Sequence, residues 1–196
     1  MEKITGLILA GGRGIRMGNI DKGLKLFNGI ALVAHAVQRF APQVDELLIN
    51  ANCHHEEYGA FGHRVIADAN ADFAGPLAGL LAGMTHARHP LIACVPCDSP
   101  LLPADLVSRL LAALQRDHAD VAVATTHARS HPVFCLVNTS LAPHLQAYLD
   151  SGQRKFEKWY ADLKTVEVSF DDDAAAFSNI NTIDELAALE QSSTEK

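Results

Sequence analysis

The chain has 196 residues and lacks the features that mark several classes of protein. Its four cysteines, Cys53, Cys94, Cys97 and Cys135, are too few and too scattered to form a disulfide scaffold at this length. The longest apolar runs, such as residues 91–96, fall far short of the roughly 20 residues that cross a bilayer. The N-terminus runs straight into a strand-like segment without the pattern of a signal peptide. We therefore expect an unexported, cytoplasmic protein.

Basic residues are also scarce. Sixteen Lys and Arg stand against 23 Asp and Glu, which gives a formal net charge of -7. This balance works against a broad surface that tracks nucleic-acid phosphates, so we expect no nucleic-acid partner. From the short apolar runs we also expect no membrane association. The local distribution differs, because residues 13–25 contain four cations and one acidic residue, Asp21. A small anion can bind there.

What is present is an alternation of strand-like and helix-like segments. Apolar runs rich in Val, Ile and Leu predict strands at 4–9, 46–49, 64–67, 91–95, 121–124, 133–137 and 165–170. Helical periodicity predicts helices at 31–40, 76–86, 103–117, 140–149 and 154–160.

Several of these runs are apolar on both faces, which is typical of a parallel sheet covered on each side by helices. The sequence therefore predicts an α/β fold: a three-layer α/β/α sandwich with a mostly parallel, Rossmann-like sheet. We expect one domain over residues 1–196. Residues from about 1 to 100 would form a nucleotide-binding half. Residues from about 101 to 196 would form an acceptor-binding half, and the strict alternation is lost after about residue 125.

The strongest chemical signal is the glycine-rich segment 9–18, which directly follows the first predicted strand. Its glycines let the backbone approach a phosphate and turn several N–H groups toward it. Arg16 and Lys22 add positive charge for the same anion. The segment therefore predicts a loop that holds a nucleoside triphosphate. The alternative is an ordinary flexible turn, but such turns rarely gather four glycines and two cations.

Two commoner phosphate motifs do not fit this segment. A dinucleotide-binding G-x-G-x-x-G that starts at Gly12 and Gly14 would need glycine where Met17 stands. A P-loop needs Gly-Lys-Ser/Thr, but Gly23 is followed by Leu24.

A second signal is Asp98, which follows a buried strand and stands between prolines. The carboxyl ends of parallel strands face the ligand crevice, and Mg²⁺ prefers one or two carboxylates together with phosphate oxygens. We therefore expect Asp98 to be a Mg²⁺ ligand. Taken alone, it could equally be a turn or helix-capping aspartate.

Cysteine and histidine carry weaker signals. Cys94 and Cys97 form C-x-x-C, but at the end of a strand they point to opposite faces, so we reject a redox or zinc site and interpret all four cysteines as small core or lining residues. Most of the ten histidines are expected at the surface. His131 opens a strand and either faces the crevice or lies at the strand edge.

Late polar residues are candidates for binding the second substrate. Asn179 and Asn181 lie just before a helix with a capping box, where amides and a helix N-terminus can hold an anion, although Asn181 or Thr182 would also serve as a plain cap. Arg154 and Lys155 belong to a basic patch that includes Lys158. A solvated helix face is the usual explanation for such a patch.

Taken in order, these motifs resemble those of the molybdenum cofactor guanylyltransferases, the MobA family. The resemblance spans the chain and rests on residues 9–12 with 16–18 and 21–22, Asn50 and Asn52, Asp68, 75–79, 96–98 and 179–182. Relatives that use CTP look similar at the loop but commonly carry alanine in place of Gly11. One departure is Asp184, where the family often has proline, and a first helical turn tolerates either residue.

The resemblance implies a Mg²⁺-dependent nucleotidyltransferase that moves GMP from GTP to the phosphate of molybdopterin and releases pyrophosphate. It implies nucleotide contacts from Leu9, Ala10, Gly11, Gly12, Lys22, Asn50, Asp68, Gly79 and Asp98. Other cofactor-biosynthesis proteins or acceptor molybdoenzymes are candidate partners. Arg16, Lys22 and Asp98 would carry catalysis: the two cations would neutralise charge directly, and Asp98 would do so through the Mg²⁺ that it holds. An ionised acceptor phosphate needs no general base. The alternatives are a sugar-phosphate or CTP-using nucleotidyltransferase and a non-catalytic nucleotide-binding module.

Overall fold

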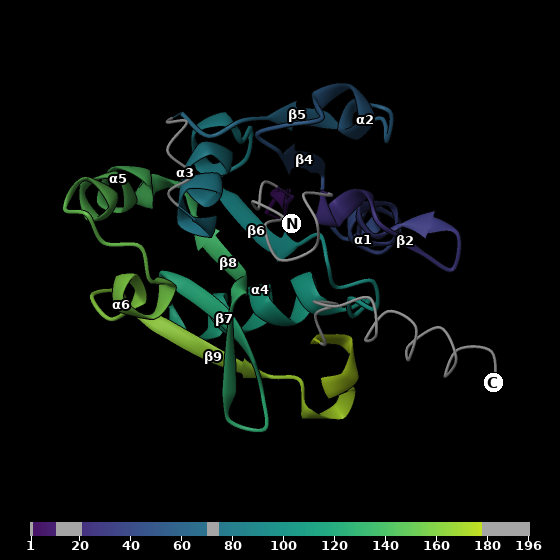
Figure 1. Ribbon diagram of the computed structural model, residues 1–196. Coiled ribbons are helices and arrows are strands. Elements are labelled where there is room, and N and C mark those ends of the chain that lie inside the picture. The colour runs from purple at the N-terminus through teal and green to yellow at the C-terminus, as the bar shows by residue number, and fades with distance from the viewer. Residues whose placement is uncertain (1, 11–20, 70–74, 178–196) are drawn as a thin grey trace.

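The computed structural model describes residues 2–10, 21–69 and 75–177. A seven-stranded sheet forms its middle layer, with strand order β5-β4-β1-β6-β8-β7-β9 (Figure 1). β8 runs antiparallel to β6 and β7, and the other neighbours are parallel. The strands are β1 (Ile4–Leu9), β4 (Glu46–Asn50), β5 (Arg64–Ile66), β6 (Leu91–Pro96), β7 (Val121–Thr126), β8 (Arg129–Asn138) and β9 (Thr165–Ser169). The predicted mostly parallel sheet is confirmed.

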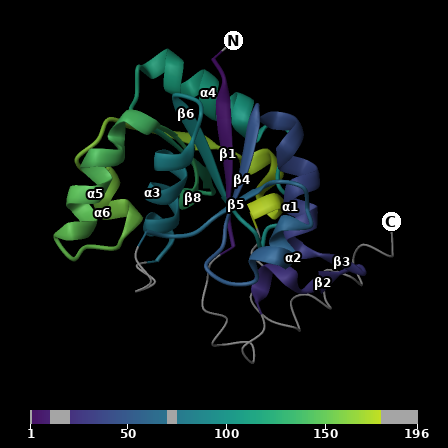
Figure 2. The ribbon, with the colours of Figure 1, turned by 90° about the horizontal axis from the view of Figure 1, so that it is seen from above.

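Helices cover both faces of this sheet (Figure 2). One face carries α1 (Leu32–Phe40), α2 (His55–Gly59), α4 (Leu106–Asp117) and the 3₁₀ segment η5 (Asp171–Phe177). The other face carries α3 (Pro76–His86), α5 (Ala142–Asp150) and α6 (Phe156–Tyr160). The three-layer sandwich is therefore confirmed. No helix within the described ranges is both long and apolar enough to cross a membrane.

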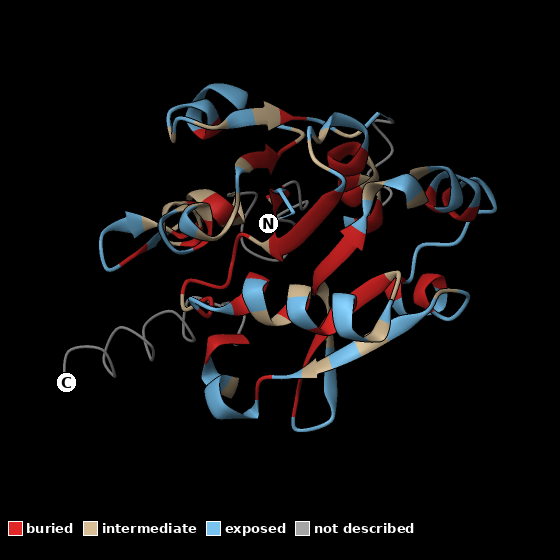
Figure 3. Ribbon diagram, turned by 180° about the vertical axis from the view of Figure 1, so that it is seen from behind, coloured by how far each residue is buried: buried red, intermediate tan, exposed pale blue. Residues whose placement is uncertain are grey.

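Two apolar cores lie on opposite faces of the sheet, which is why β1, β4 and β6 are buried except for one end residue each (Figure 3). Alternation along β1 sends Ile4 and Ile8 into the core beneath α1 and α4, and Leu7 into the core beneath α3. Because both faces need apolar side chains, these strands read as continuous hydrophobic runs. That pattern made their prediction from sequence possible.

The cysteines follow the same division. Cys94 is buried in the core on the α3 face and Cys97 in the core on the α1 face, so the sheet separates them as predicted. Burial raises the pKa of both thiols above the usual range. Cys135 lies opposite Cys94 on β8 and is also buried, whereas Cys53 is exposed. The prediction of a core position is therefore wrong for Cys53.

Several short elements were not predicted. β2 (Leu26–Phe27) and β3 (Ile30–Ala31) form a hairpin around Asn28 and Gly29, whose φ values of 50° and 76° are those that an Asn-Gly hairpin turn requires. Strands of two residues are too short to show a period. The other unpredicted elements are α2, η2 (Lys22–Leu24), η3 (Ala41–Gln43), η4 (Thr139–Leu141) and η5.

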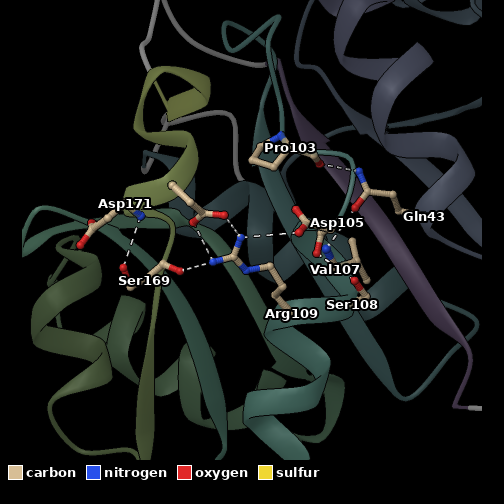
Figure 4. Close-up of polar contacts among 9 residues, drawn as sticks. Gln43, Pro103, Asp105, Val107, Ser108, Arg109, Ser169 and Asp171 are labelled. Atoms are coloured by element: carbon tan, nitrogen blue, oxygen red, sulfur yellow. Dashed lines mark hydrogen bonds and ion pairs between the residues drawn. The ribbon is translucent and has the colours of Figure 1, made fainter.

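α4 begins at Leu106, three residues after the predicted start at Pro103. The Gln43 side chain lies against this segment: its amide donates to the Pro103 carbonyl at 2.9 Å, and its oxygen accepts from the Val107 amide at 3.1 Å (Figure 4). The Pro103 carbonyl is thus bound from outside the helix, and Val107 receives its cap from a residue far away in sequence. Local periodicity cannot indicate such a start.

Arg109 joins α4 to the chain that leaves β9 (Figure 4). Its guanidinium donates to both carboxylate oxygens of Asp172, at 2.9 and 3.0 Å, and to the Ser169 carbonyl at 2.5 Å. It also lies 4.0 Å from the centre of the buried Phe170 ring, a favourable cation–π geometry. These contacts hold η5 against the first turn of α4.

Gly83 allows α3 to pack closely on the sheet. A Cβ atom there would lie 2.5 Å from Leu7 Cδ2 and 2.9 Å from Ile92 Cδ1, and both side chains are fully buried and cannot move aside. We expect Gly83→Ala to destabilise the fold by about 1–3 kcal/mol through overpacking, in spite of the better helix propensity of alanine. Urea unfolding measures this change. In the control Gly59→Ala, on α2, the new Cβ meets no atom within 4 Å, and we expect unchanged or slightly higher stability. Equal stability of both variants would contradict the packing argument.

Candidate active site at the carboxyl edge of the sheet

The carboxyl ends of β1, β4 and β6 lie level with one another. Leu9 is in register with Asn50 on one side and with Pro96 on the other. Two backbone hydrogen bonds extend this alignment beyond the strands, from the Ala10 amide to the Asn50 carbonyl at 2.8 Å and from the Cys97 amide to the Leu9 carbonyl at 3.0 Å. Residues that follow these strands therefore share one edge of the sheet, the usual ligand edge of an open α/β sheet.

Lys22 and Asp98, predicted separately from two motifs, form an ion pair at this edge. Lys22 Nζ donates to Asp98 Oδ2, and the two side chains are only 25% and 12% exposed. Partial burial strengthens the pair relative to one in open solvent. The pair links the segment after β1 to the end of β6, across 76 positions of sequence.

The other carboxylate oxygen, Asp98 Oδ1, is buried and accepts no hydrogen bond from the described part of the chain. A buried carboxylate oxygen without a donor is costly and marks a place where an external partner fits. Nowhere in the described ranges do three or more His, Cys, Asp or Glu side chains come together as a metal site. The donor set at Asp98 is thus one carboxylate, which suits a hard divalent cation that takes its other ligands from phosphate and water.

Asp21 and Tyr58 support the position of Lys22. Asp21 caps the 3₁₀ turn η2, where its carboxylate accepts from the Gly23 amide at 3.1 Å and from the Tyr58 hydroxyl at 2.5 Å. Burial, together with the nearby Cys97 and Asp21, raises the pKa of Tyr58 far above its usual range, so the hydroxyl keeps its proton and stays a donor. A side chain at position 23 would collide with this hydroxyl, so glycine is required there.

Asn50, Asn52 and Asp68 form a second polar group, at the ends of β4 and β5. Asn50 Nδ2 donates to Asp68 Oδ1 and Asn52 Nδ2 donates to Asp68 Oδ2, both at 2.9 Å. In return, Asn52 Oδ1 accepts from the Asp68 backbone amide at 2.9 Å. Asn50 is buried, while Asn52 and Asp68 are half-buried. The sequence-predicted pair of Asn50 and Asp68 is therefore brought into direct contact.

Gly79 lies in α3 against the same group. A Cβ at this position would stand 2.5 Å from Asn50 Oδ1 and 2.7 Å from Leu9 Cδ2. The missing side chain lets the helix approach the ends of β1 and β4, which places the start of α3 beside the polar edge.

The remaining predicted site residues fall into two groups. Gly11, Gly12, Arg16, Asn179 and Asn181 lie outside the described residues. Arg154 and Lys155 are exposed in the connection between α5 and α6. There, the Arg154 guanidinium donates to the carbonyls of Leu149 at 2.7 Å and Gln153 at 2.6 Å.

His131 is half-buried near the turn between β7 and β8. One of its ring nitrogens, Nε2, lies 2.6 Å from Thr126 Oγ1, and its ring packs against Phe177 with centres 4.9 Å apart. Burial, with a smaller contribution from Arg129, lowers the pKa of the imidazole. These contacts tie His131 to the aromatic cluster around η5.

Sequence reasoning missed Tyr58 as a support of the site. No local signal marks it, because it lies on a five-residue helix and meets Asp21 across 37 positions of sequence. Asn52 was noted only as part of a motif, and its double contact with Asp68 was not foreseen.

The fold and this edge define a nucleotidyltransferase. Residues 6–166 match the MobA-like NTP transferase domain, and the chain belongs to this family.

Close relatives agree with this membership. The chain is 55% identical over 195 residues to a protein of Burkholderia ambifaria named molybdenum cofactor guanylyltransferase, and the match covers 95% of each chain. It is 53% identical over 190 residues to a protein of the same name from Bordetella petrii, covering 95% of this chain and 96% of that one.

Solved structures share the fold at low sequence identity. Molybdopterin-guanine dinucleotide biosynthesis protein A from Archaeoglobus fulgidus superposes with a TM-score of 0.83 at 20% identity, covering 98% of this chain and 100% of that one. The 4-diphosphocytidyl-2C-methyl-D-erythritol synthase of Anaerococcus prevotii has a TM-score of 0.77 at 12% identity, covering 98% and 99%.

Proposed function

We propose that this chain transfers GMP from GTP to the phosphate of a molybdopterin-type cofactor, releasing pyrophosphate and forming the guanine dinucleotide form of that cofactor. The observation that carries the proposal is the Lys22–Asp98 pair at the ends of β1 and β6, with a second Asp98 oxygen left without a donor in the described part of the chain. Relatives at 55% identity that are named for this activity support the choice of nucleotide and acceptor.

The triphosphate would lie at the end of β1, held by backbone groups of Leu9, Ala10, Gly11 and Gly12. Lys22 and Arg16 would place positive charge on the phosphates and on the departing pyrophosphate. The acceptor phosphate is already ionised at neutral pH, so its oxygen can attack the α-phosphate without a base. The work of the chain is then to align the two substrates in line and to neutralise charge.

Asp98 is the residue that would hold Mg²⁺. Its Oδ1 is buried without a donor from the described part of the chain and fits a hard cation, and its other oxygen is bound by Lys22. When bound, Mg²⁺ supplies charge stabilisation to phosphate oxygens. The ion pair holds the Asp98 carboxylate in place for that ligand.

The two substrates would occupy different parts of the sheet edge. β5, β4, β1 and β6 come from the first hundred residues, whereas β8, β7 and β9 come from the remainder. This division supports a nucleotide-binding half over about residues 1–100, with Asn50, Asp68 and Gly79 around the nucleoside. Residues from about 101 to 196 would bind the acceptor, with Arg154, Lys155, Asn179 and Asn181 as the proposed contacts. The proposed location is the cytoplasm, and the proposed partners are cofactor-biosynthesis proteins or acceptor molybdoenzymes.

Pyrophosphate release tests this function directly. The purified chain is incubated with Mg²⁺ and GTP, CTP or ATP, each with a molybdopterin-type acceptor or a sugar phosphate. We expect release with GTP and the pterin acceptor, at least tenfold faster than with any other combination. Faster release with CTP or with a sugar phosphate would assign a different transferase activity. No release with any pair would instead favour a non-catalytic nucleotide-binding role.

A further inference from the structure

Asn52 forms two hydrogen bonds with Asp68. A contact between Asp68 and a nucleotide would not by itself require them. The Asn52 amide nitrogen donates to the Asp68 carboxylate and its amide oxygen accepts from the Asp68 backbone, each at 2.9 Å. The bond to the backbone ties Asn52 to position 68, and the bond to Oδ2, together with the Asn50 bond to Oδ1, fixes the rotation of the Asp68 carboxylate. A half-buried carboxylate in contact with water needs no such support, because water satisfies it.

The hydrogen bonds leave a defined set of acceptor sites on Asp68. A carboxylate offers about four lone-pair sites, two on each oxygen. Asn50 uses one site on Oδ1 and Asn52 uses one on Oδ2. Counting only donors in the described part of the chain, each oxygen therefore retains one acceptor site. A partner with two adjacent N–H donors can fill both at once.

The position of Asp68 along the sheet matches that of a nucleobase. It follows β5, and in the order β5-β4-β1-β6 it stands three strand spacings from β6, where Asp98 lies. Three spacings amount to about 14 Å. If the phosphates lie between Lys22 and Asp98, the ribose separates them from a base at the β4–β5 end of the edge.

We propose that Asn52 is a positioning residue for base selection, which holds the Asp68 carboxylate so that its two oxygens together face the N1–H and N2–H donors of guanine. This inference rests on the proposed function, since it takes guanine as the base. Adenine and cytosine present a ring-nitrogen acceptor where guanine presents N1–H, and that acceptor would be repelled by the carboxylate. Hypoxanthine keeps N1–H but lacks the 2-amino group, so it can fill only one of the two sites.

The test compares guanine and hypoxanthine nucleotides in the wild type and in Asn52→Ala. Calorimetry gives the dissociation constants of GDP and IDP, and pyrophosphate release gives kcat/KM for GTP and ITP. We expect the wild type to prefer guanine by about tenfold or more. In Asn52→Ala the carboxylate keeps only its bond from Asn50 and can turn about it, so its two oxygens no longer face the base together. This costs guanine, which needs both oxygens, more than hypoxanthine, which needs one. The preference should then fall to about threefold or less.

Three variants complete the experiment. Asn52→Ser, which is small and polar, is measured beside Asn52→Ala in case the alanine variant folds poorly. Asp68→Asn replaces one carboxylate acceptor by a donor and should remove the guanine preference. Asn138→Ala removes an exposed asparagine that caps η4 on a different strand end, and should keep the wild-type ratio.

If Asn52 has a purely structural role, Asn52→Ala would weaken the binding of GDP and IDP by the same factor and leave the ratio of their dissociation constants unchanged. That result would overturn the inference. A wild type that binds GDP and IDP equally would overturn it too. The binding measurement needs no acceptor. It therefore still decides the role of Asn52 if the wild type fails to transfer GMP, which would count against the proposed function alone.

Discussion

Replacing Asp98 by alanine is expected to lower turnover with GTP and the pterin acceptor by roughly a hundredfold or more, a loss of about 3 kcal/mol in transition-state stabilisation. The substitution removes the carboxylate whose Oδ1 is buried without a donor in the described ranges, and it also removes the partner of Lys22. Without the carboxylate Mg²⁺ is held less well, and Lys22 loses a contact that positions it, so the charge stabilisation that in-line transfer requires is reduced. Steady-state pyrophosphate release at saturating Mg²⁺ measures the effect.

Two controls separate this effect from damage to the fold. Asp98→Asn keeps the volume and a hydrogen-bonding group but loses the charge, and we expect a similar loss of turnover with little change in thermal stability. Asp105→Ala removes an exposed carboxylate seven positions away, whose contact is an ion pair with Arg109 at 3.5 Å, and it should leave turnover near normal. Near-normal turnover of Asp98→Asn would refute the assigned role.

Lys22→Ala is expected to weaken the binding of GTP by roughly tenfold to a hundredfold and the binding of GMP much less. Lys22 Nζ stands at the ends of β1 and β6, where the outer phosphates are proposed to lie, and a charge-assisted bond to phosphate is worth about 1.5–3 kcal/mol. GMP lacks those outer phosphates. Calorimetric titration of both nucleotides with Mg²⁺ gives the two ratios.

The matched control is Lys25→Ala, because Lys25 is a half-buried lysine three positions further along the same segment. Its loss should weaken the binding of GTP and of GMP by small and similar factors. If Lys22→Ala weakens the binding of GTP and of GMP to the same extent, Lys22 does not act on the outer phosphates.

Much of the sheet could be predicted from sequence, because a strand that is buried on both faces appears in the sequence as a continuous apolar run. β1 and β6 are examples: their residues feed two separate cores, so hardly any position is polar. The β2–β3 hairpin carries no such signal, since each strand has two residues and Leu26 and Ile30 are exposed. The start of α4 also escaped prediction because Gln43, some 60 positions earlier, supplies its contacts.

Residues of the site could be predicted where the residue type and its motif together indicate a chemical role. Lys22 and Asp98 came from separate motifs, and the structure brings them into one ion pair. The supports of the site could not be predicted, because Tyr58 and Asn52 act through contacts that only the tertiary fold creates. Of the acceptor-binding predictions, Arg154 and Lys155 are exposed in a loop and stay proposals, while Asn179 and Asn181 lie outside the described residues.

The central claim is that a guanine nucleotide and Mg²⁺ bind together at the edge that holds Lys22 and Asp98. Calorimetric titration of the wild type with GTP, CTP and ATP, each with and without Mg²⁺, tests it most directly. We predict that GTP binds at least tenfold more tightly than CTP or ATP, and that Mg²⁺ strengthens GTP binding in the wild type but not in Asp98→Asn. Equal affinity for the three nucleotides, or GTP binding that does not respond to Mg²⁺, would contradict the account.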